Sequence, residues 1–240
     1  MDEIYFSMIV YVDDEGLLKR SLRSILDVTA RIIGKIKLIV ADAIVSDTTK
    51  EVCDKAAEGL HEYQYVYLAL ADAVIGEAYN QALRYIEGRY VNFSLASTWF
   101  EPKTLDMVYT FAQEQERPKL LALAPWTVNE KDEYVQYKMS PEADKERYVK
   151  ISLHDTPEKL HLMFHAYFIR CYLIRSSECH KEFRPELSED APLEMLCNLL
   201  AEHMHYTYLQ HVCLHYTRQM EDNTSAFMEQ HYTWWYMDSF

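Results

Sequence analysis

Residues 88–99 read GRYVNFSLASTW, and this stretch decides the fold. Gly88 ends a run with helical spacing, and Tyr90 to Leu95 is an apolar run with the length of a buried strand. The residues from Trp99 to Pro102 predict a turn into the next helix. In open α/β sheets, ligands bind at the carboxyl ends of such strands. A ligand site is therefore expected just after Leu95.

The positions at this expected site carry no charge: they are Leu95, Ala96, Ser97 and Thr98. Hard divalent cations prefer oxygen ligands, above all the carboxylates of Asp and Glu. None of these four side chains is a carboxylate, so the sequence predicts no metal site here.

Working outward from this stretch, strand-like and helix-like runs alternate along the first half of the chain. The strand-like runs are residues 6–12, 36–41, 64–70, 90–95 and 120–124, and the helix-like runs are residues 17–26, 48–59, 76–87 and 102–115, the last with Pro102 in its first turn. Regular alternation predicts an α/β fold, with a doubly wound and mostly parallel sheet flanked by helices.

A smaller antiparallel and helical portion is expected after Pro125. Strands are predicted at residues 134–139, 166–170 and 206–217, helices from residue 156, at 173–178, from 188 to 200 and at 226–240, and a loop at 140–150. The predicted organisation is residues 1–125 as the ligand-binding half of one domain, 126–218 as its second half, and 219–240 as a C-terminal aromatic helix. Because that helix is too aromatic to stay in solvent, it is expected to pack on the domain, on a second copy or on a further domain.

Composition excludes several classes of protein. With 240 residues and a net charge of −14, the chain repels phosphate backbones, so no nucleic-acid partner is predicted. It has neither a signal-peptide pattern nor a run of about 18 apolar residues, which favours a cytoplasmic location. Its five cysteines contain no CxxC pair, so reduced thiols are expected.

Three further segments point to a family. Residues 9–15 read IVYVDDE, residues 36–49 read IKLIVADAIVSDTT, and residues 183–191 read FRPELSEDA. In this order, and with GRYVNF between them, they resemble the family 2 glycosyltransferases. The resemblance implies a GT-A fold and transfer of a sugar from a nucleotide diphosphate donor.

The resemblance also implies nucleotide-binding residues. Asp42 stands where the family has an aspartate that hydrogen-bonds a uracil or similar base, although capping of the following turn is an equal alternative. Asp13 or Glu15 would lie near the ribose. Asn80 matches the asparagine of an R-N-x-G pattern, in which Tyr79 replaces the arginine.

For catalysis, the resemblance identifies Asp190 as the general base that deprotonates the acceptor hydroxyl; the alternative is a helix N-terminal carboxylate favoured by the macrodipole. Residues 95–98 stand where the family has D-S-D-D. Mg²⁺ or Mn²⁺ is the family norm, but its ligands are missing from this motif. No cofactor is therefore predicted.

Histidines and an arginine supply further candidates. His215 and Arg218 could contact a diphosphate. His211, Cys213 and His215 alternate onto one strand face, a spacing that suits a soft metal ion, but a half-buried strand explains it more simply. His161 and His165 lack the glutamate of HExxH and are interpreted as a packed surface pair.

Two hypotheses follow from the sequence. In the first, the protein transfers a glycosyl group from a UDP-type nucleotide sugar to a glycan or cell-surface acceptor, either without the usual metal or as an inactive relative. In the second, it is a non-catalytic GT-A domain that acts as a binding or scaffolding module in glycan assembly. Either role could place it at the inner face of the membrane through partners.

Overall fold

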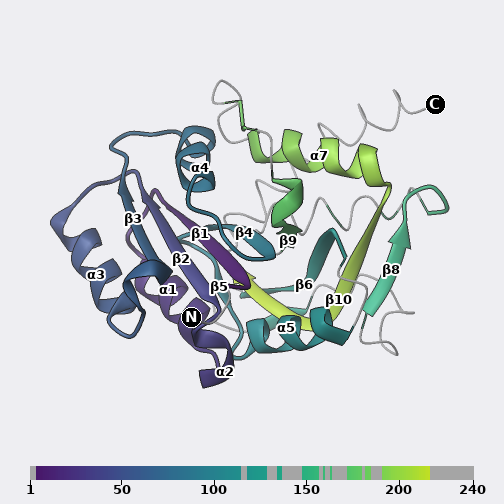
Figure 1. The fold of residues 1–240 in the computed structure, drawn as a ribbon, viewed down its shortest axis with the longest axis horizontal. Coiled ribbons are helices and arrows are strands. Elements are labelled where there is room, and N and C mark those ends of the chain that lie inside the picture. Colours follow the sequence, from purple (N-terminus) through teal and green to yellow (C-terminus); the bar gives the residue numbers. More distant parts are fainter. Residues whose placement is uncertain are drawn as a thin grey trace.

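A computed structural model of the chain describes residues 4–114, 118–128, 134–136, 148–156, 159, 163, 172–179, 182–184 and 191–216. These residues form one mixed sheet with helices on both faces (Figure 1). The order of strands along its main path is β3-β2-β1-β4-β9-β6-β10-β5, with β7 beside β6 and β8 beside β10. The strands are β1 (Phe6–Val12), β2 (Ile36–Asp42), β3 (Tyr65–Ala69), β4 (Tyr90–Leu95), β5 (Trp99–Phe100), β6 (Leu120–Val128), β7 (Tyr134–Gln136), β8 (Tyr148–Ser152), β9 (Tyr172–Arg175) and β10 (His205–Tyr216).

The helices lie on two sides of this sheet. In Figure 1, α4 and α7 lie together on one side, and α1, α2 and α5 lie on the other. The helices are α1 (Leu18–Leu26), α2 (Ala30–Ile33), α3 (Asp47–Ala57), α4 (Ile75–Leu83), α5 (Thr104–Glu114) and α7 (Ala191–His203), with 3₁₀ turns η1 (Glu62–Gln64) and η4 (Ser176–Glu178).

Strands β3, β2, β1 and β4 run parallel, so their carboxyl ends meet at one edge of the sheet. Every residue of β1 and β2 is buried, as near-continuous apolar runs predict for central parallel strands. Val12 is level with Asp42, and Tyr11 with Leu95. We call the carboxyl ends of β1, β2 and β4 the carboxyl edge. The segments that follow Val12, Asp42 and Leu95, in which the sequence predicted site residues, therefore lie next to one another.

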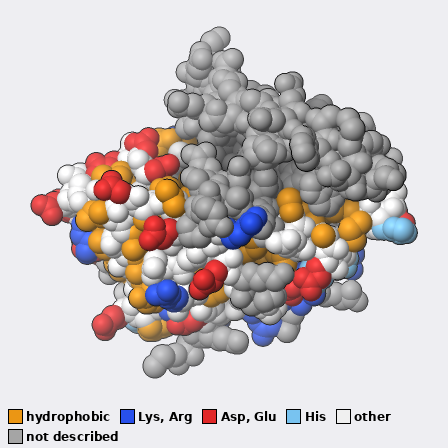
Figure 2. Space-filling model, turned by 90° about the horizontal axis from the view of Figure 1, so that it is seen from above, with side chains coloured by type: hydrophobic (Ala, Val, Ile, Leu, Met, Phe, Trp, Pro, Cys, Tyr) orange, Lys and Arg blue, Asp and Glu red, His pale blue; other side chains and the backbone are white. Residues whose placement is uncertain are grey.

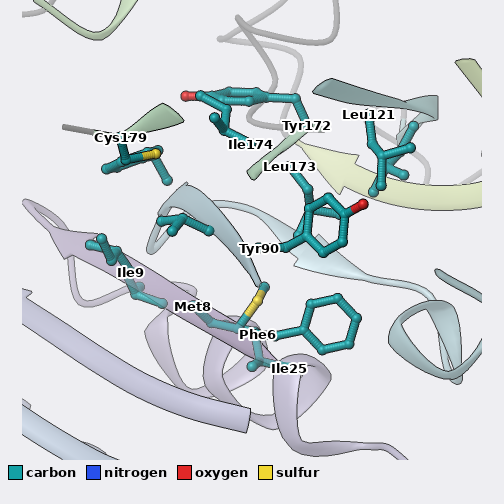
Figure 3. Packing of buried hydrophobic residues seen from close by; sticks show 14 of the residues in the cluster. Phe6, Met8, Ile9, Ile25, Tyr90, Leu121, Tyr172, Leu173, Ile174 and Cys179 are labelled. Atoms are coloured by element: carbon teal, nitrogen blue, oxygen red, sulfur yellow. The ribbon is translucent and has the colours of Figure 1, made fainter. Parts of the chain in front are cut away.

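The predicted fold class is confirmed. The parallel half is followed by a smaller portion in which β9 is antiparallel to both β4 and β6, and β7 and β8 add antiparallel edges. A single cluster of buried side chains extends from β1 to β10; Figure 3 shows Phe6 and Met8 near Tyr90, with Tyr172 and Leu173 from β9 beyond them.

Four local predictions were wrong. Leu173 to Glu178 was expected to be helical, but Tyr172–Arg175 is the buried strand β9, because pairing on both sides overrides helical spacing. Trp99–Phe100 is a short strand against β10 rather than a turn. Pro102 lies before α5, not in its first turn; Lys103 (φ 65°) intervenes. Tyr148 to Lys150 belongs to β8 rather than a loop.

The predicted strand at 166–170 and helix at 226–240 lie outside the described residues. Within the described ranges, none of the helices combines the length and the apolar character that crossing a bilayer requires. Acidic and hydrophobic side chains are interspersed on the face of the molecule shown in Figure 2.

Candidate functional site

The loop after β1 is tied to the start of α3 by Glu15. Its Oε1 accepts hydrogen bonds from the hydroxyls of Ser46 and Thr49. Ser46 is also the N-cap of α3, because its Oγ accepts from the Thr49 backbone N–H at 3.0 Å. The two hydroxyl donors lower the pKa of Glu15 from its ordinary value of 4.5. Glu15 is thus engaged within the protein, at the position expected to lie near a ribose.

Removing this carboxylate should change the acid sensitivity of the protein. Because the folded pKa of Glu15 lies below 4.5, its stabilising contribution is complete above that pH and is lost as the pH falls through the folded value. Glu15→Gln should therefore lose less stability than the wild type between about pH 6 and about pH 3 in urea-unfolding series. Glu51→Gln, on the exposed face of α3, is the control and should follow the wild type. Identical pH profiles for all three proteins would contradict the role of Glu15.

Asp42 is fully buried at the end of β2. Its Oδ1 accepts from the backbone N–H of Ile44 at 2.9 Å and of Val45 at 3.1 Å, and its Oδ2 accepts from the Tyr67 hydroxyl. The carboxylate therefore supports its own loop, which is the capping alternative. Tyr67 was not identified from sequence, because no local pattern shows that β3 places its hydroxyl beside Asp42.

The loop that Asp42 supports has an unusual surface for a nucleotide site. Ile44 and Val45 are 37% and 42% exposed. Val45 has a φ of 54°, a conformation that a β-branched residue rarely adopts. The loop that follows Asp42 is therefore apolar and strained.

Asn80 holds the chain that leads toward Asp190. Its Nδ2 donates to the carbonyl of Phe183 at 2.8 Å, and its Oδ1 accepts from the Phe183 N–H at 2.7 Å. Both ends of the amide are thus engaged by one backbone position, 103 residues away in sequence. Phe183 opens the FRPELSEDA segment, so Asn80 positions its beginning.

Beside Asn80, an aromatic cluster fills the space under the carboxyl edge. Tyr79 is fully buried, and its hydroxyl donates to the Ser94 carbonyl at 3.1 Å. Its ring lies 5.0 Å from that of Phe93 and 5.6 Å from that of Phe183. The residue that replaces the arginine of the family pattern is therefore part of the core.

Polar groups of residues 95–98 are hydrogen-bonded within the protein. Ala96 is fully buried, and its N–H donates to the Tyr11 carbonyl at 2.9 Å. The Thr98 hydroxyl donates to the Leu95 carbonyl at 2.9 Å and lies 2.7 Å from the Ser94 hydroxyl. Leu95 and Ser97 are half-buried.

These residues do not fit Mg²⁺ or Mn²⁺. Residues 95–98 offer no carboxylate, and the Thr98 hydroxyl is already bound inside the protein. Within the described part of the chain, no three His, Cys, Asp or Glu side chains are grouped so that they could hold a metal ion.

Two further groups lie near this segment. The backbone of His215 pairs with that of Trp99, so the predicted diphosphate contact is placed beside the motif, although its side chain lies outside the described part. The guanidinium of Arg20 lies 4.0 Å from the centroid of the Trp99 ring. Sequence reasoning missed Arg20, because helical spacing gives no sign of this contact.

Other candidates are only partly described. Asp190, Arg218, His161 and His165 lie outside the described residues. The register between β10 and β6 shifts between Leu209 and Leu214, and the side chains of His211, Cys213 and His215 lie outside the described part of the chain.

Within the described part of the chain, Cys53, Cys179 and Cys197 take part in no disulfide. Burial raises the pKa of Cys53 and of Cys179 to about 12. Neither thiol is a nucleophile at neutral pH, because the reactive form is the thiolate.

A sequence pattern described as Glycosyl transferase family 2 matches residues 7–174. The chain belongs to glycosyl transferase family 2. The match includes β1, β2 and β4 and ends in β9, so the membership covers the whole carboxyl edge. A comparison with curated protein sequences gave no match.

Solved structures of S. aureus TarS share the fold of this family 2 chain. One crystal structure of TarS is 18% identical, with a TM-score of 0.68 over 89% of this chain and 37% of that one. TarS 1–349 in complex with UDP is 17% identical, with a TM-score of 0.70 over 89% of this chain and 60% of that one. The complex with UDP-GlcNAc is 16% identical, with a TM-score of 0.67 over 89% and 58%. The chain thus spans 37% to 60% of the length of these three structures.

Proposed function

We propose that this family 2 domain is a non-catalytic binding or scaffolding module in glycan assembly. The observation that carries the proposal is the structure of residues 95–98. In place of metal-binding aspartates there are a fully buried alanine and a threonine whose hydroxyl donates to the Leu95 carbonyl. The fold is retained, while uncharged side chains that are buried or half-buried occupy the position where the family resemblance implies metal-binding aspartates.

The charge of the carboxyl edge supports the same proposal. A diphosphate leaving group needs cations or aligned N–H groups to offset its charge as it departs. Asp13, Asp14 and Glu15 are exposed after β1 and add negative charge there instead. Loss of a metal that acts on a phosphoryl oxygen costs several kcal/mol of transition-state stabilisation. The Arg20 guanidinium, which is stacked on Trp99, carries a single charge and does not replace a divalent metal.

A second candidate is metal-independent transfer from a UDP-type donor to a glycan acceptor. The observation that favours it is the bond pair between Asn80 and Phe183, which holds the start of the segment containing Asp190. In this reaction the acceptor oxygen would bond to the anomeric carbon, the bond from that carbon to the diphosphate would break, UDP would leave, and Asp190 would take the acceptor proton.

Calorimetric titration with UDP and UDP-GlcNAc, each with and without Mn²⁺, tests the proposal. We expect no binding tighter than about 1 mM, which corresponds to about −4.1 kcal/mol, and no effect of Mn²⁺. Donor hydrolysis is measured in parallel for the wild type, Asp190→Asn and the control Asp47→Asn.

The outcomes separate the candidates. Binding that Mn²⁺ strengthens would overturn both the module and the metal-independent transferase. Hydrolysis without metal that is lost in Asp190→Asn, and kept in Asp47→Asn, would establish the second candidate in place of the first.

A further inference from the structure

A pocket of about 250 Å³ opens at the amino-terminal end of β4. It is lined by Gly88, Arg89, Tyr90, Arg175, Ser176 and Ser177. At about 3.3 Å per residue, the length of β4 separates it by roughly 20 Å from the carboxyl edge. The pocket is therefore distinct from the site described above.

The backbone around the two arginines is fixed. Arg175 is the antiparallel partner of Tyr90, and the Ser176 N–H donates to the Arg89 carbonyl at 2.8 Å. The Arg175 N–H donates to the Lys119 carbonyl at 2.8 Å. Arg175, the last residue of β9, and Arg89, which directly precedes β4, are therefore held side by side by backbone hydrogen bonds. The Arg89 guanidinium also lies 5.8 Å from the centroid of the Tyr5 ring.

The positive charge of these arginines is not neutralised by the described residues. Glu87, two residues before Arg89, pairs with Lys37 at 2.5 Å. Glu178, three residues after Arg175, pairs with Lys119 at 3.4 Å and with His203 at 2.9 Å. Two like charges thus share one pocket in a protein whose net charge is −14.

A hydroxyl in the same lining also lacks a partner. The Ser176 Oγ is buried and makes no hydrogen bond to any described residue. A buried polar atom without a partner costs free energy, unless a ligand or water supplies one. Together with the two guanidinium groups, it forms a set of donors that no acceptor among the described residues satisfies.

We propose that this pocket binds a phosphate monoester in its dianionic form. Guanidinium groups bind phosphate oxygens through paired, charge-assisted hydrogen bonds, and two arginines match the two negative charges. The Ser176 hydroxyl supplies a neutral donor. At about 30 Å³ per water molecule, the volume equals roughly eight waters, which leaves room for a small organic group beyond the phosphate.

Titration with glycerol 3-phosphate in a chloride buffer, followed by amide shifts in ¹H–¹⁵N spectra, tests the proposal. We expect shifts at Gly88, Ser176 and Ser177 and none at residues 95–98. Arg89→Gln and Arg175→Gln should each weaken binding by about tenfold or more, since a hydrogen bond to a charged group is lost. Arg84→Gln, at the exposed C-cap of α4, should bind as the wild type does.

Dimethyl phosphate, a diester with one negative charge, distinguishes the two classes of phosphate and should bind at least about tenfold more weakly. Equal binding of both probes, or full binding by either pocket variant, would overturn the proposal. Unfolding midpoints without phosphate show that the variants are folded. Because neither UDP nor Asp190 enters this experiment, its result is independent of the proposed function.

Discussion

Replacing Gly88 with alanine should lower the free energy of unfolding by roughly 2–5 kcal/mol. Gly88 has a φ of +80°, in the left-handed region that strains residues with a Cβ. A Cβ at this position would lie 2.6 Å from the carbonyl oxygen of Ile4 and 2.9 Å from the carbonyl carbon of Tyr5. Both are backbone atoms, so a side-chain rotation cannot relieve the contact. Urea unfolding measures the change.

The control is Gly59→Ala. A Cβ at Gly59 meets nothing within 4 Å, and its φ lies outside the strained range. This variant should stay within about 1 kcal/mol of the wild type. If the two variants were equally stable, the close approach of residue 88 to the chain entering β1 would be contradicted.

The same position shows why part of the fold could be predicted from sequence. The helix before Gly88 was predicted to run to residue 87, but α4 ends at Leu83; the buried strand after Gly88 follows from the apolar pattern of Tyr90 to Leu95. Strands β1 and β2 were predicted for the same reason, since a strand covered on both faces has an uninterrupted apolar sequence. The apolar pattern within one segment is therefore sufficient to predict a strand whose residues are all buried.

Local pattern failed where distant segments decide the structure. Tyr172–Arg175 is a strand because β4 and β6 pair with it from both sides, and neither partner is near it in sequence. The interruption between Leu209 and Leu214 likewise depends on β6. Such pairing cannot be derived from the spacing of side chains within one segment.

The candidate site shows the same division. The absence of carboxylates at residues 95–98 is plain from sequence, but the hydrogen bond from Thr98 to Leu95 is not. Asn80 was predicted to bind a nucleotide, and the structure places its amide on the Phe183 backbone, 103 residues away. A sequence motif shows which residue matches the family pattern, whereas only the fold shows what that residue contacts.

Asp42→Ala should destabilise the protein by about 2–4 kcal/mol. The substitution removes the acceptor of the Ile44 and Val45 N–H groups and of the Tyr67 hydroxyl. Asp42 is fully buried, so water cannot readily replace the carboxylate. Thermal and urea unfolding measure the effect.

Asp47→Ala is the matched control, because Asp47 is an exposed carboxylate at the first turn of α3. It should cost no more than about 1 kcal/mol through loss of its interaction with the helix dipole. The pair separates the two roles that the sequence left open for Asp42. If Asp42 serves the loop, its loss lowers stability. If instead Asp42→Ala were as stable as the wild type and lost measurable affinity for UDP, the carboxylate would be a nucleotide ligand, and the non-catalytic module would have to be abandoned because the donor site would be intact at β2.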